Sequence, residues 1–227
     1  MCSREPRGRA EEARLYWSRR APSYDESPWH TCCPGVWRRL LSAVLPLGRR
    51  ALDLGTGTGF IASILVGMGY SHVIGVDVSP EMLSRARAKL WGTAGHLVDL
   101  VEADAAWLPL RSGAVDALFA RHVLWALHDP WTALREAARC AEVAAFTFST
   151  RSSPPRTVDG VPSTPLRWVA SPDDVLRVAQ EAGVRARMVE ASWVRVEQSR
   201  ETGGLPEGET GYYVLLVERV SGSVSSR

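Results

Sequence analysis

A short apolar strand that runs into alternating glycines constrains this chain more than any other feature. Residues 51–59 read Ala-Leu-Asp-Leu-Gly-Thr-Gly-Thr-Gly, and a second apolar segment, 72–78, carries Asp77 near its end. Glycine lets the backbone turn sharply and approach a ligand closely. Ligands of open α/β sheets bind outside the carboxyl ends of the strands, so the glycines and Asp77 are expected at one crevice. We predict a site for a nucleotide-like cofactor, with Asp77 accepting hydrogen bonds from the ribose hydroxyls.

The spacing of the glycines separates two classes of cofactor. Gly55, Gly57 and Gly59 are spaced G-x-G-x-G, whereas the dinucleotide fingerprint G-x-G-x-x-G requires a glycine where Phe60 stands. Asp53 precedes this loop on the strand. A buried carboxylate there would be repelled by a pyrophosphate and attracted by the ammonium group of a methionine moiety. The pattern therefore favours S-adenosylmethionine over a nicotinamide dinucleotide.

These residues resemble the first motif of the class I S-adenosylmethionine-dependent methyltransferases, apolar-acidic-apolar-Gly-x-Gly-x-Gly. The resemblance extends over about residues 13 to 150. It implies that Asp104-Ala105 contacts the adenine ring, although Asp104 as a solvated helix cap is the alternative. The segment 120–130 ends in a family-like L-x-D-P pattern, which implies that the backbone near Arg121 contacts the methionine moiety. The cofactor-binding residues implied are Tyr16, Arg20, Tyr24, Asp53, Gly55, Thr56, Gly57, Gly59, Asp77, Val78, Met82, Asp104, Ala105 and Arg121.

The N-terminal segment narrows the resemblance. Residues 16–25, Tyr-Trp-Ser-Arg-Arg-Ala-Pro-Ser-Tyr-Asp, are similar to the W-x-x-R-A-x-x-Y-D segment of small-molecule methyltransferases related to the ubiquinone and menaquinone type, the methyltransferase type 11 group. The match implies that Arg20 binds the cofactor carboxylate and that Tyr16 and Tyr24 close over it. An aromatic amphipathic helix packed on the domain is the alternative. The chain departs from the family at 140–143, where Cys-Ala-Glu-Val replaces a Pro-Gly-Gly turn.

The order of apolar segments predicts an α/β fold. Five apolar runs alternate with helical segments, which indicates parallel strands covered on both faces. Helices are expected to begin at Ser79-Pro80, Asp129-Pro130 and Ser171-Pro172. Two further strands, 185–196 and 212–220, are expected to flank a long hairpin loop. The resemblance implies a Rossmann-like three-layer sandwich whose seven-stranded, mostly parallel sheet has its last strand antiparallel.

We expect three parts along the chain. Helical patterns over 10–20 and 35–45 indicate an N-terminal helical cap, residues 1–46. The S-adenosylmethionine-binding domain is expected over 47–220, followed by a disordered tail, 221–227. The irregular segment 149–170 contains several prolines and is interpreted as a lid or substrate wall.

The chemistry of methyl transfer leaves little for catalytic side chains to do. Alignment alone supplies up to about 7 to 11 kcal/mol, and a general base is optional. His122 is the first candidate for such a base and His30 the second, with a hydrogen-bonded structural histidine as the alternative for each. The chain has 9 tryptophans. An aromatic-lined pocket would suit a planar or apolar molecule, or a cationic amine bound by cation–π attraction.

Composition restricts the classes of partner. The formal net charge is +2, which gives no electrostatic case for binding nucleic acid. We find neither an apolar run of membrane-spanning length nor the apolar core of a signal peptide, and expect a cytoplasmic protein that binds no membrane. The 4 cysteines do not form paired C-x-x-C spacings, so no metal site is predicted.

The sequence thus predicts an enzyme of class EC 2.1.1. It would transfer a methyl group from S-adenosylmethionine to oxygen, nitrogen or carbon of a small molecule, in natural product biosynthesis. The Asn/Asp-Pro-Pro-aromatic motif of exocyclic-amine methylation is absent after the fourth strand. Two alternatives are a nicotinamide-dependent oxidoreductase, tested by nicotinamide binding, and a noncatalytic cofactor-binding subunit. The second would bind the cofactor but turn over no substrate.

Overall fold

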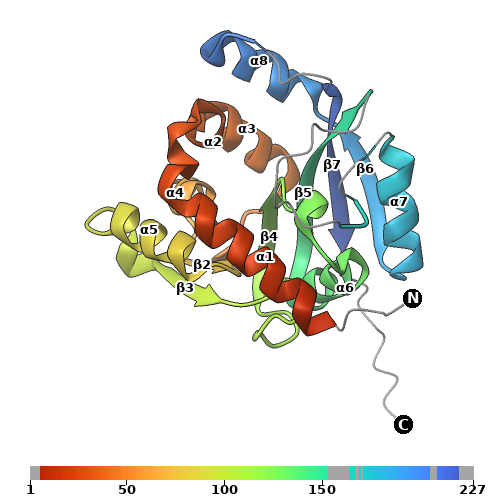
Figure 1. Ribbon diagram of the computed structural model, residues 1–227, viewed down its shortest axis with the longest axis horizontal. Coiled ribbons are helices and arrows are strands. Elements are labelled where there is room, and N and C mark those ends of the chain that lie inside the picture. The colour runs from red at the N-terminus through yellow and green to blue at the C-terminus, as the bar shows by residue number, and fades with distance from the viewer. Residues whose placement is uncertain (1–5, 153–163, 167–168, 170, 205–208, 220–227) are drawn as a thin grey trace.

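A mixed β-sheet forms the centre of the molecule (Figure 1). The computed structural model describes residues 6–152, 164–166, 169, 171–204 and 209–219. The 7-stranded sheet has the order β3-β2-β1-β4-β5-β7-β6, and β7 is antiparallel to both its neighbours. This confirms the Rossmann-like architecture with an antiparallel last strand. The strands are β1 (Arg50–Leu54), β2 (His72–Asp77), β3 (Val98–Glu102), β4 (Val115–Arg121), β5 (Ala141–Arg151), β6 (Arg185–Glu190) and β7 (Glu209–Glu218).

Helices cover the sheet on both faces. They are α1 (Pro6–Arg20), α2 (Pro28–Thr31), α3 (Pro34–Val44), α4 (Phe60–Gly67), α5 (Pro80–Leu90), α6 (Pro130–Cys140), α7 (Pro172–Glu181) and α8 (Ser192–Thr202), with the 3₁₀ turns η1 (Ala21–Glu26), η2 (Gly95–Leu97) and η3 (Leu124–Ala126). No helix in the described part of the chain has the length and apolar composition needed to cross a bilayer.

Alternating strand residues supply the two halves of the core. Leu118 on β4 belongs to a cluster with buried residues of α6 and α7, whereas its neighbour Phe119 belongs to a second cluster with α3, α4, α5 and α8. Successive side chains of a strand point to opposite faces, so a strand covered on both sides is apolar throughout. This accounts for the continuous apolar runs in the sequence and for the three layers.

The expected helix starts are present. In each, a side chain at the start of the helix forms a hydrogen bond with a backbone N–H of the first turn or the cap. The bonds are Met82 N to Ser79 Oγ at 3.2 Å, Thr132 N to Asp129 Oδ1 at 3.0 Å and Ser171 N to Asp174 Oδ2 at 3.0 Å.

The chain between β6 and β7 differs from the sequence prediction. The prediction of a strand over 185–196 followed by a hairpin loop is wrong, because β6 ends at Glu190 and α8 occupies Ser192–Thr202. Val194 and Gln198, one helical turn apart, are both fully buried on the side of α8 that faces α3 and the sheet. A buried glutamine interrupts the apolar period of this helix, and the helical pattern was therefore missed.

The loss of the Pro-Gly-Gly turn leaves the sheet intact. Helix α6 ends at Cys140 and β5 begins at Ala141, which pairs with Val115 of β4. The N-terminal region also joins the main core, since Trp37 and Leu41 of α3 pack in one cluster with β1. Residues 221–227 and most of the expected lid 149–170 lie outside the described residues, and 149–151 continue β5.

Candidate functional site

A pocket lies at the topological switch point of the sheet, at the carboxyl ends of β1 and β4. The chain adds β2 and β3 on one side of β1, then β4 and β5 on the other, and ligands of such sheets bind at this switch point. The empty space in and in front of the pocket, including space open to solvent, is about 750 Å³. Many of the predicted site residues line it: Tyr24, Gly55, Gly57, Asp77, Val78, Met82, Asp104, Ala105, Arg121 and His122.

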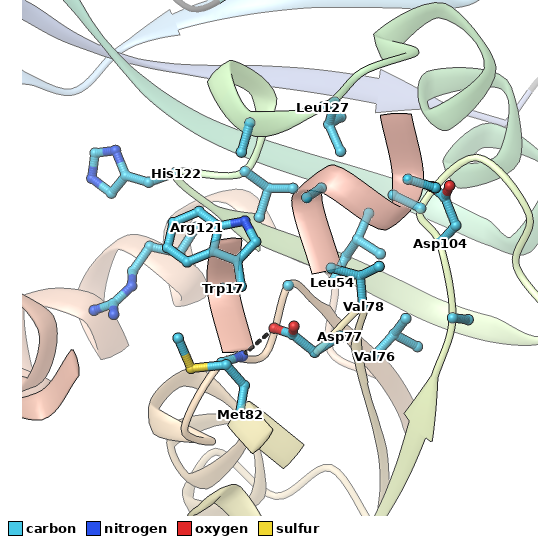
Figure 2. A pocket seen from close by; sticks show the side chains of 18 of the residues that line it. Trp17, Leu54, Val76, Asp77, Val78, Met82, Asp104, Arg121, His122 and Leu127 are labelled. Atoms are coloured by element: carbon cyan, nitrogen blue, oxygen red, sulfur yellow. Dashed lines mark hydrogen bonds between the residues drawn. The ribbon is translucent and has the colours of Figure 1, made fainter. Parts of the chain in front are cut away.

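The Asp77 carboxylate is fixed by the backbone around it. Gly57 N donates to Asp77 Oδ2 and Ser79 N to Asp77 Oδ1, each at 2.9 Å. Figure 2 shows the Asp77 carboxylate beside Val76, Val78 and Met82. Burial raises the pKa of Asp77 to about 6, against these hydrogen bonds, which lower it. Each carboxylate oxygen has a second lone pair, so the group can still accept hydrogen bonds from a diol.

The glycine loop needs its glycines for two different reasons. Gly55 has φ +69°, and a Cβ at this position would lie 2.5 Å from Val123 Cγ2. Gly57 has φ +54° and borders open pocket space next to Tyr24. The backbone therefore lines the pocket directly, with room for a ligand against Gly57.

Asp53 lies behind this loop rather than among the residues that line the pocket. Its Oδ2 accepts hydrogen bonds from Thr56 Oγ1 at 2.7 Å and Ala62 N at 2.9 Å. Burial raises the pKa of Asp53 to about 6. The contacts show that Asp53 and Thr56 hold the loop on α4, and contact of Asp53 with a methionine ammonium stays a prediction.

The opposite wall of the pocket carries Asp104. Its Oδ1 accepts from Ala106 N at 2.9 Å, as in the capping alternative, while its Oδ2 lies 3.5 Å from His128 Nε2. Val78 and Met82 line the pocket between the two carboxylates, Asp77 and Asp104. Sequence reasoning missed His128 as a site residue. The available signal was its position in the segment after β4, beside the crevice.

Helix α1 forms the roof of the pocket. Ala10, Ala13 and Trp17 face it with helical spacing, and Figure 1 shows α1 crossing in front of β4. Tyr16 and Arg20 are absent from the lining. Tyr16 instead packs edge-on against Trp17, with ring centroids 4.9 Å apart.

Arg20 has an unpaired donor, and the roof is fastened to the glycine loop. Among the described residues, Arg20 Nε is buried without a hydrogen-bond partner. Asp25 accepts a hydrogen bond from Thr58 Oγ1 at 2.7 Å and lies 2.7 Å from Lys89 Nζ. Gly59 packs against α5 rather than facing the pocket, because a Cβ there would meet Leu90 and Ala86.

The side chains of Arg121 and His122 point away from Asp77 and lie at the end of the pocket opposite Asp104 (Figure 2). Arg121 Nη2 donates to His30 O at 2.7 Å. His122 has φ +56°, an uncommon backbone for a residue other than glycine, and its N–H donates to Thr147 Oγ1 at 3.1 Å. Strained residues of this kind cluster at functional sites.

The His122 imidazole is held in a polar cluster that local sequence patterns did not reveal. Its Nε2 lies 3.1 Å from Tyr212 Oη and 3.3 Å from Arg195 Nη2. Glu209 Oε2 pairs with Arg195 Nε at 2.9 Å. Burial lowers the pKa of His122 well below its ordinary value, and the charge of Arg195 lowers it further.

His30, the second predicted base, lies outside the pocket lining. Its ring stacks on Tyr24 with centroids 3.9 Å apart, and its Nδ1 forms a hydrogen bond with Tyr24 O. Burial lowers the pKa of His30. These contacts support the structural alternative, in which His30 positions Tyr24 and receives the Arg121 hydrogen bond at its carbonyl.

Comparison with known proteins places the chain among methyltransferases. Residues 52–145 match the family model of a methyltransferase domain. A tRNA U34 carboxymethyltransferase of Methylococcus capsulatus is 32% identical over 186 residues, which are 74% of this chain and 55% of the relative. A demethylmenaquinone methyltransferase of Thermus thermophilus is 41% identical over 85 residues, covering 36% of this chain and 38% of the relative. The chain therefore spans about half the length, or less, of these curated relatives.

A solved structure with a similar fold is that of the [4+2]-cyclase SpnF, with TM-score 0.70 and 18% identity over 93% of this chain and 96% of that one. The fold similarity covers nearly all of both chains. The glycine loop, the fixed Asp77 carboxylate and the matching domain agree with the resemblance drawn from the sequence. The chain belongs to the class I S-adenosylmethionine-dependent methyltransferase family, and S-adenosylmethionine is the cofactor of that family.

Proposed function

We propose that this protein binds S-adenosylmethionine in the pocket under α1 and transfers its methyl group to a small molecule. The observation that carries the proposal is the Asp77 carboxylate, which Gly57 N and Ser79 N hold at the edge of the pocket. S-adenosylmethionine supplies an electrophilic methyl group on a positively charged sulfur. Every other contribution comes from the side chains that bind and orient the two reactants.

The residues present fit the cofactor. Asp77 offers carboxylate lone pairs for a ribose diol, and Val78 and Met82 offer apolar surface for an adenine ring. Asp104 and the backbone of Ala105 lie on the adjoining wall for the polar edge of that ring. The roles of Arg20 and Tyr24 at the methionine end are proposals that rest on the sequence resemblance, supported by the unpaired Arg20 Nε.

The roof explains how the site would exclude water. Trp17 and Tyr24 cover the pocket, and Asp25, Thr58 and Lys89 fasten η1 to the glycine loop. An in-line displacement needs alignment of the nucleophile with the methyl carbon, and orientation is worth up to about 7 to 11 kcal/mol. A fastened roof supplies alignment without any proton transfer.

A small-molecule acceptor is supported by the position of α1 over the pocket and by the N-terminal segment, which is similar to that of quinone-type methyltransferases. The relative that acts on tRNA makes RNA the competing substrate class. We further propose, from the sequence observations above, a role in natural product biosynthesis and a cytoplasmic location.

The proposal is tested with methyl-labelled S-adenosylmethionine and an extract of the source organism. After incubation, the extract is separated into small-molecule, protein and RNA fractions. Label in the small-molecule fraction is the expected result and supplies the product for identification by mass. Label in RNA or protein would reject the substrate class.

Cofactor binding, measured by calorimetry, separates the remaining alternatives. Tight binding of S-adenosylmethionine with no labelled product would indicate the noncatalytic subunit. Binding of reduced nicotinamide cofactor in its place would indicate the oxidoreductase, which family membership already disfavours. Asp99→Asn on the exposed end of β3 is a matched control for Asp77→Asn, since the Asp99 side chain is 71% exposed.

A further inference from the structure

The end of the pocket that would receive the acceptor is surrounded by arginines. Arg195, Arg121 and Arg151 all lie close enough to His122 to act on it electrostatically. Glu209 pairs with Arg195 at 2.9 Å and with Arg151 at 3.7 Å. Both of these arginines therefore pair with Glu209.

Arg121 is the arginine of this group that lines the pocket. Asp53 is the carboxylate that Arg121 acts on electrostatically, but both hydrogen bonds described for Asp53 come from Thr56 and Ala62. Arg121 Nη2 donates to His30 O, whereas Nη1 is buried without a partner among the described residues. An unsatisfied buried donor on a charged group destabilises the protein unless a ligand accepts from it.

The contacts of His122 fix which of its nitrogens carries the proton. A guanidinium group has no acceptor, so Arg195 Nη2 at 3.3 Å can only donate to His122 Nε2. Tyr212 Oη lies 3.1 Å from the same nitrogen, and its hydroxyl can donate to it once Nε2 is the acceptor. The neutral imidazole therefore carries its proton on Nδ1. His122 is among the residues that line the pocket, and in this tautomer the nitrogen with no hydrogen bond described for it is an N–H donor and not the lone pair of a general base.

The aromatic rings at this end are already occupied by cations. The guanidinium carbon of Arg121 lies 5.1 Å from the Trp37 ring centroid and 4.8 Å from that of Phe60. That of Arg195 lies 4.7 Å from the Tyr212 ring centroid and 5.4 Å from that of Trp29. A cationic amine would have to displace an arginine from its ring and would be repelled by the others.

We propose that the acceptor enters as an oxyanion, with carboxylate the simplest case, and that the unpaired Arg121 N–H and the Nδ1–H of His122 bind it. Arg195 is a positioning residue that acts through His122 by holding its tautomer. This inference rests on the proposed function and assigns the acceptor class of the same site. Amines are excluded because the available groups donate hydrogen bonds and carry positive charge.

The transfer then needs no base. An electron pair of the acceptor oxyanion forms the new O–C bond to the methyl group, the S–C bond breaks, and its electron pair remains on sulfur as a neutral thioether. No proton is removed, because a carboxylate is ionised in water before it binds. The product has lost its negative charge, so the same donors bind it more weakly and favour its release.

The experiment uses the full chain saturated with S-adenosylhomocysteine, after calorimetry has shown that this ligand binds. Histidine is labelled with ¹⁵N, and the ring signals of His122 are identified by their loss in His122→Asn. Benzoate, benzamide and benzamidinium, which share a shape and differ in charge, are added separately. Affinities are measured by titration in wild type, in Arg121→Lys, in Arg121→Met and in Arg87→Met, an exposed arginine on α5.

The expected spectrum shows the Nδ1–H tautomer of His122 and a shift of that signal with benzoate alone. Benzoate should bind at least 10-fold more tightly than either analogue, and Arg121→Met should remove this preference while Arg87→Met and Arg121→Lys keep most of it. An Nε2–H tautomer would overturn the inference, as would equal binding of the three probes or no binding of benzoate. Because the tautomer and the probe preference are measured in wild type, an unfolded variant leaves the test valid. Failure of S-adenosylhomocysteine to bind would instead reject the proposed function.

Discussion

Lys89 and Asp25 connect helix α5 to the turn that follows the roof of the pocket. Lys89 Nζ lies 2.7 Å from Asp25 Oδ2 and donates to Thr58 Oγ1 at 2.9 Å, while Thr58 donates to Asp25. Three segments that are distant in sequence are thus joined beside the glycine loop. The contact connects the turn that follows α1 to the glycine loop at which we propose that the cofactor binds.

Lys89→Met should release S-adenosylhomocysteine faster, with a loss of stability on the order of 0.5 kcal/mol, because the pair is partly exposed and screened by water. Stopped-flow dissociation and urea unfolding measure the two effects, with Arg87→Met as the control. Equal dissociation rates in both variants would show that the contact does not hold the roof.

The stability difference between wild type and Lys89→Met should depend on pH. Burial acts to raise the pKa of Asp25, but hydrogen bonds from Lys89 and Thr58 hold it below its usual value. A carboxyl with a lowered folded pKa stabilises the protein above its unfolded pKa of about 3.9 and loses this contribution as pH falls through the folded value. The difference should therefore be constant from pH 7 to 5 and shrink in stronger acid.

Asp77→Asn should weaken S-adenosylmethionine binding by about 1.5 to 3 kcal/mol, the range for hydrogen bonds to a charged group. Asparagine has nearly the same shape and keeps an acceptor oxygen for one of the two backbone N–H groups, while the other N–H group loses its acceptor. Calorimetry measures the affinity and a melting curve checks the fold. Unchanged affinity in Asp77→Asn, relative to Asp99→Asn, would reject the assignment of Asp77 to the ribose.

Asp53 should make the protein without ligand relatively more stable at pH 5 than at pH 7. Its pKa is about 6 because of burial, above the unfolded value of about 3.9, so the folded state binds the proton more tightly between these values. Asp53→Asn does not titrate. The stability of wild type relative to this variant should rise on the order of 2 kcal/mol as pH falls from 7 to 4. A difference in unfolding free energy between wild type and Asp53→Asn that does not change with pH would contradict this prediction.

His122 should change the stability of the protein with pH in the direction opposite to Asp53. Burial and Arg195 lower its pKa, so the unfolded chain takes up a proton below about pH 6.5 that the folded chain resists. Wild type should therefore lose stability relative to His122→Asn as pH falls from 7.5 to 5.5. Asparagine tolerates the positive φ of this position, which keeps the backbone. Urea unfolding at the two pH values gives the sign.

Gly59→Ala should destabilise the protein more than Gly69→Ala. Both glycines have positive φ, and an alanine costs roughly 1 to 2 kcal/mol in that region. At Gly59 the new Cβ would also lie 3.1 Å from Leu90 Cδ1, whereas nothing lies within 4 Å at Gly69. Equal melting temperatures for the two variants would show that α5 can move to accommodate the new Cβ without loss of stability.

The sequence by itself determined the strands, the helix starts and the cofactor loop. These features depend on local rules: apolar runs for strands buried on both faces, a cap followed by proline, and glycines where φ is positive. Asp77 could be predicted as a site residue because it ends a strand whose neighbour runs into the glycine loop. Such a signal lies within a few residues of the group that it identifies.

Only the tertiary structure decided the acceptor end of the pocket and helix α8. His122 meets Arg195 and Tyr212, which are 73 and 90 residues away in sequence, and no local pattern joins them. The sequence made His122 a candidate base, whereas Arg195 can only donate to its Nε2, which favours the tautomer with the proton on Nδ1. Helix α8 was missed because tertiary packing buries Gln198 where an apolar residue is expected. Contacts between distant segments set protonation and burial, and periodicity along the chain does not encode them.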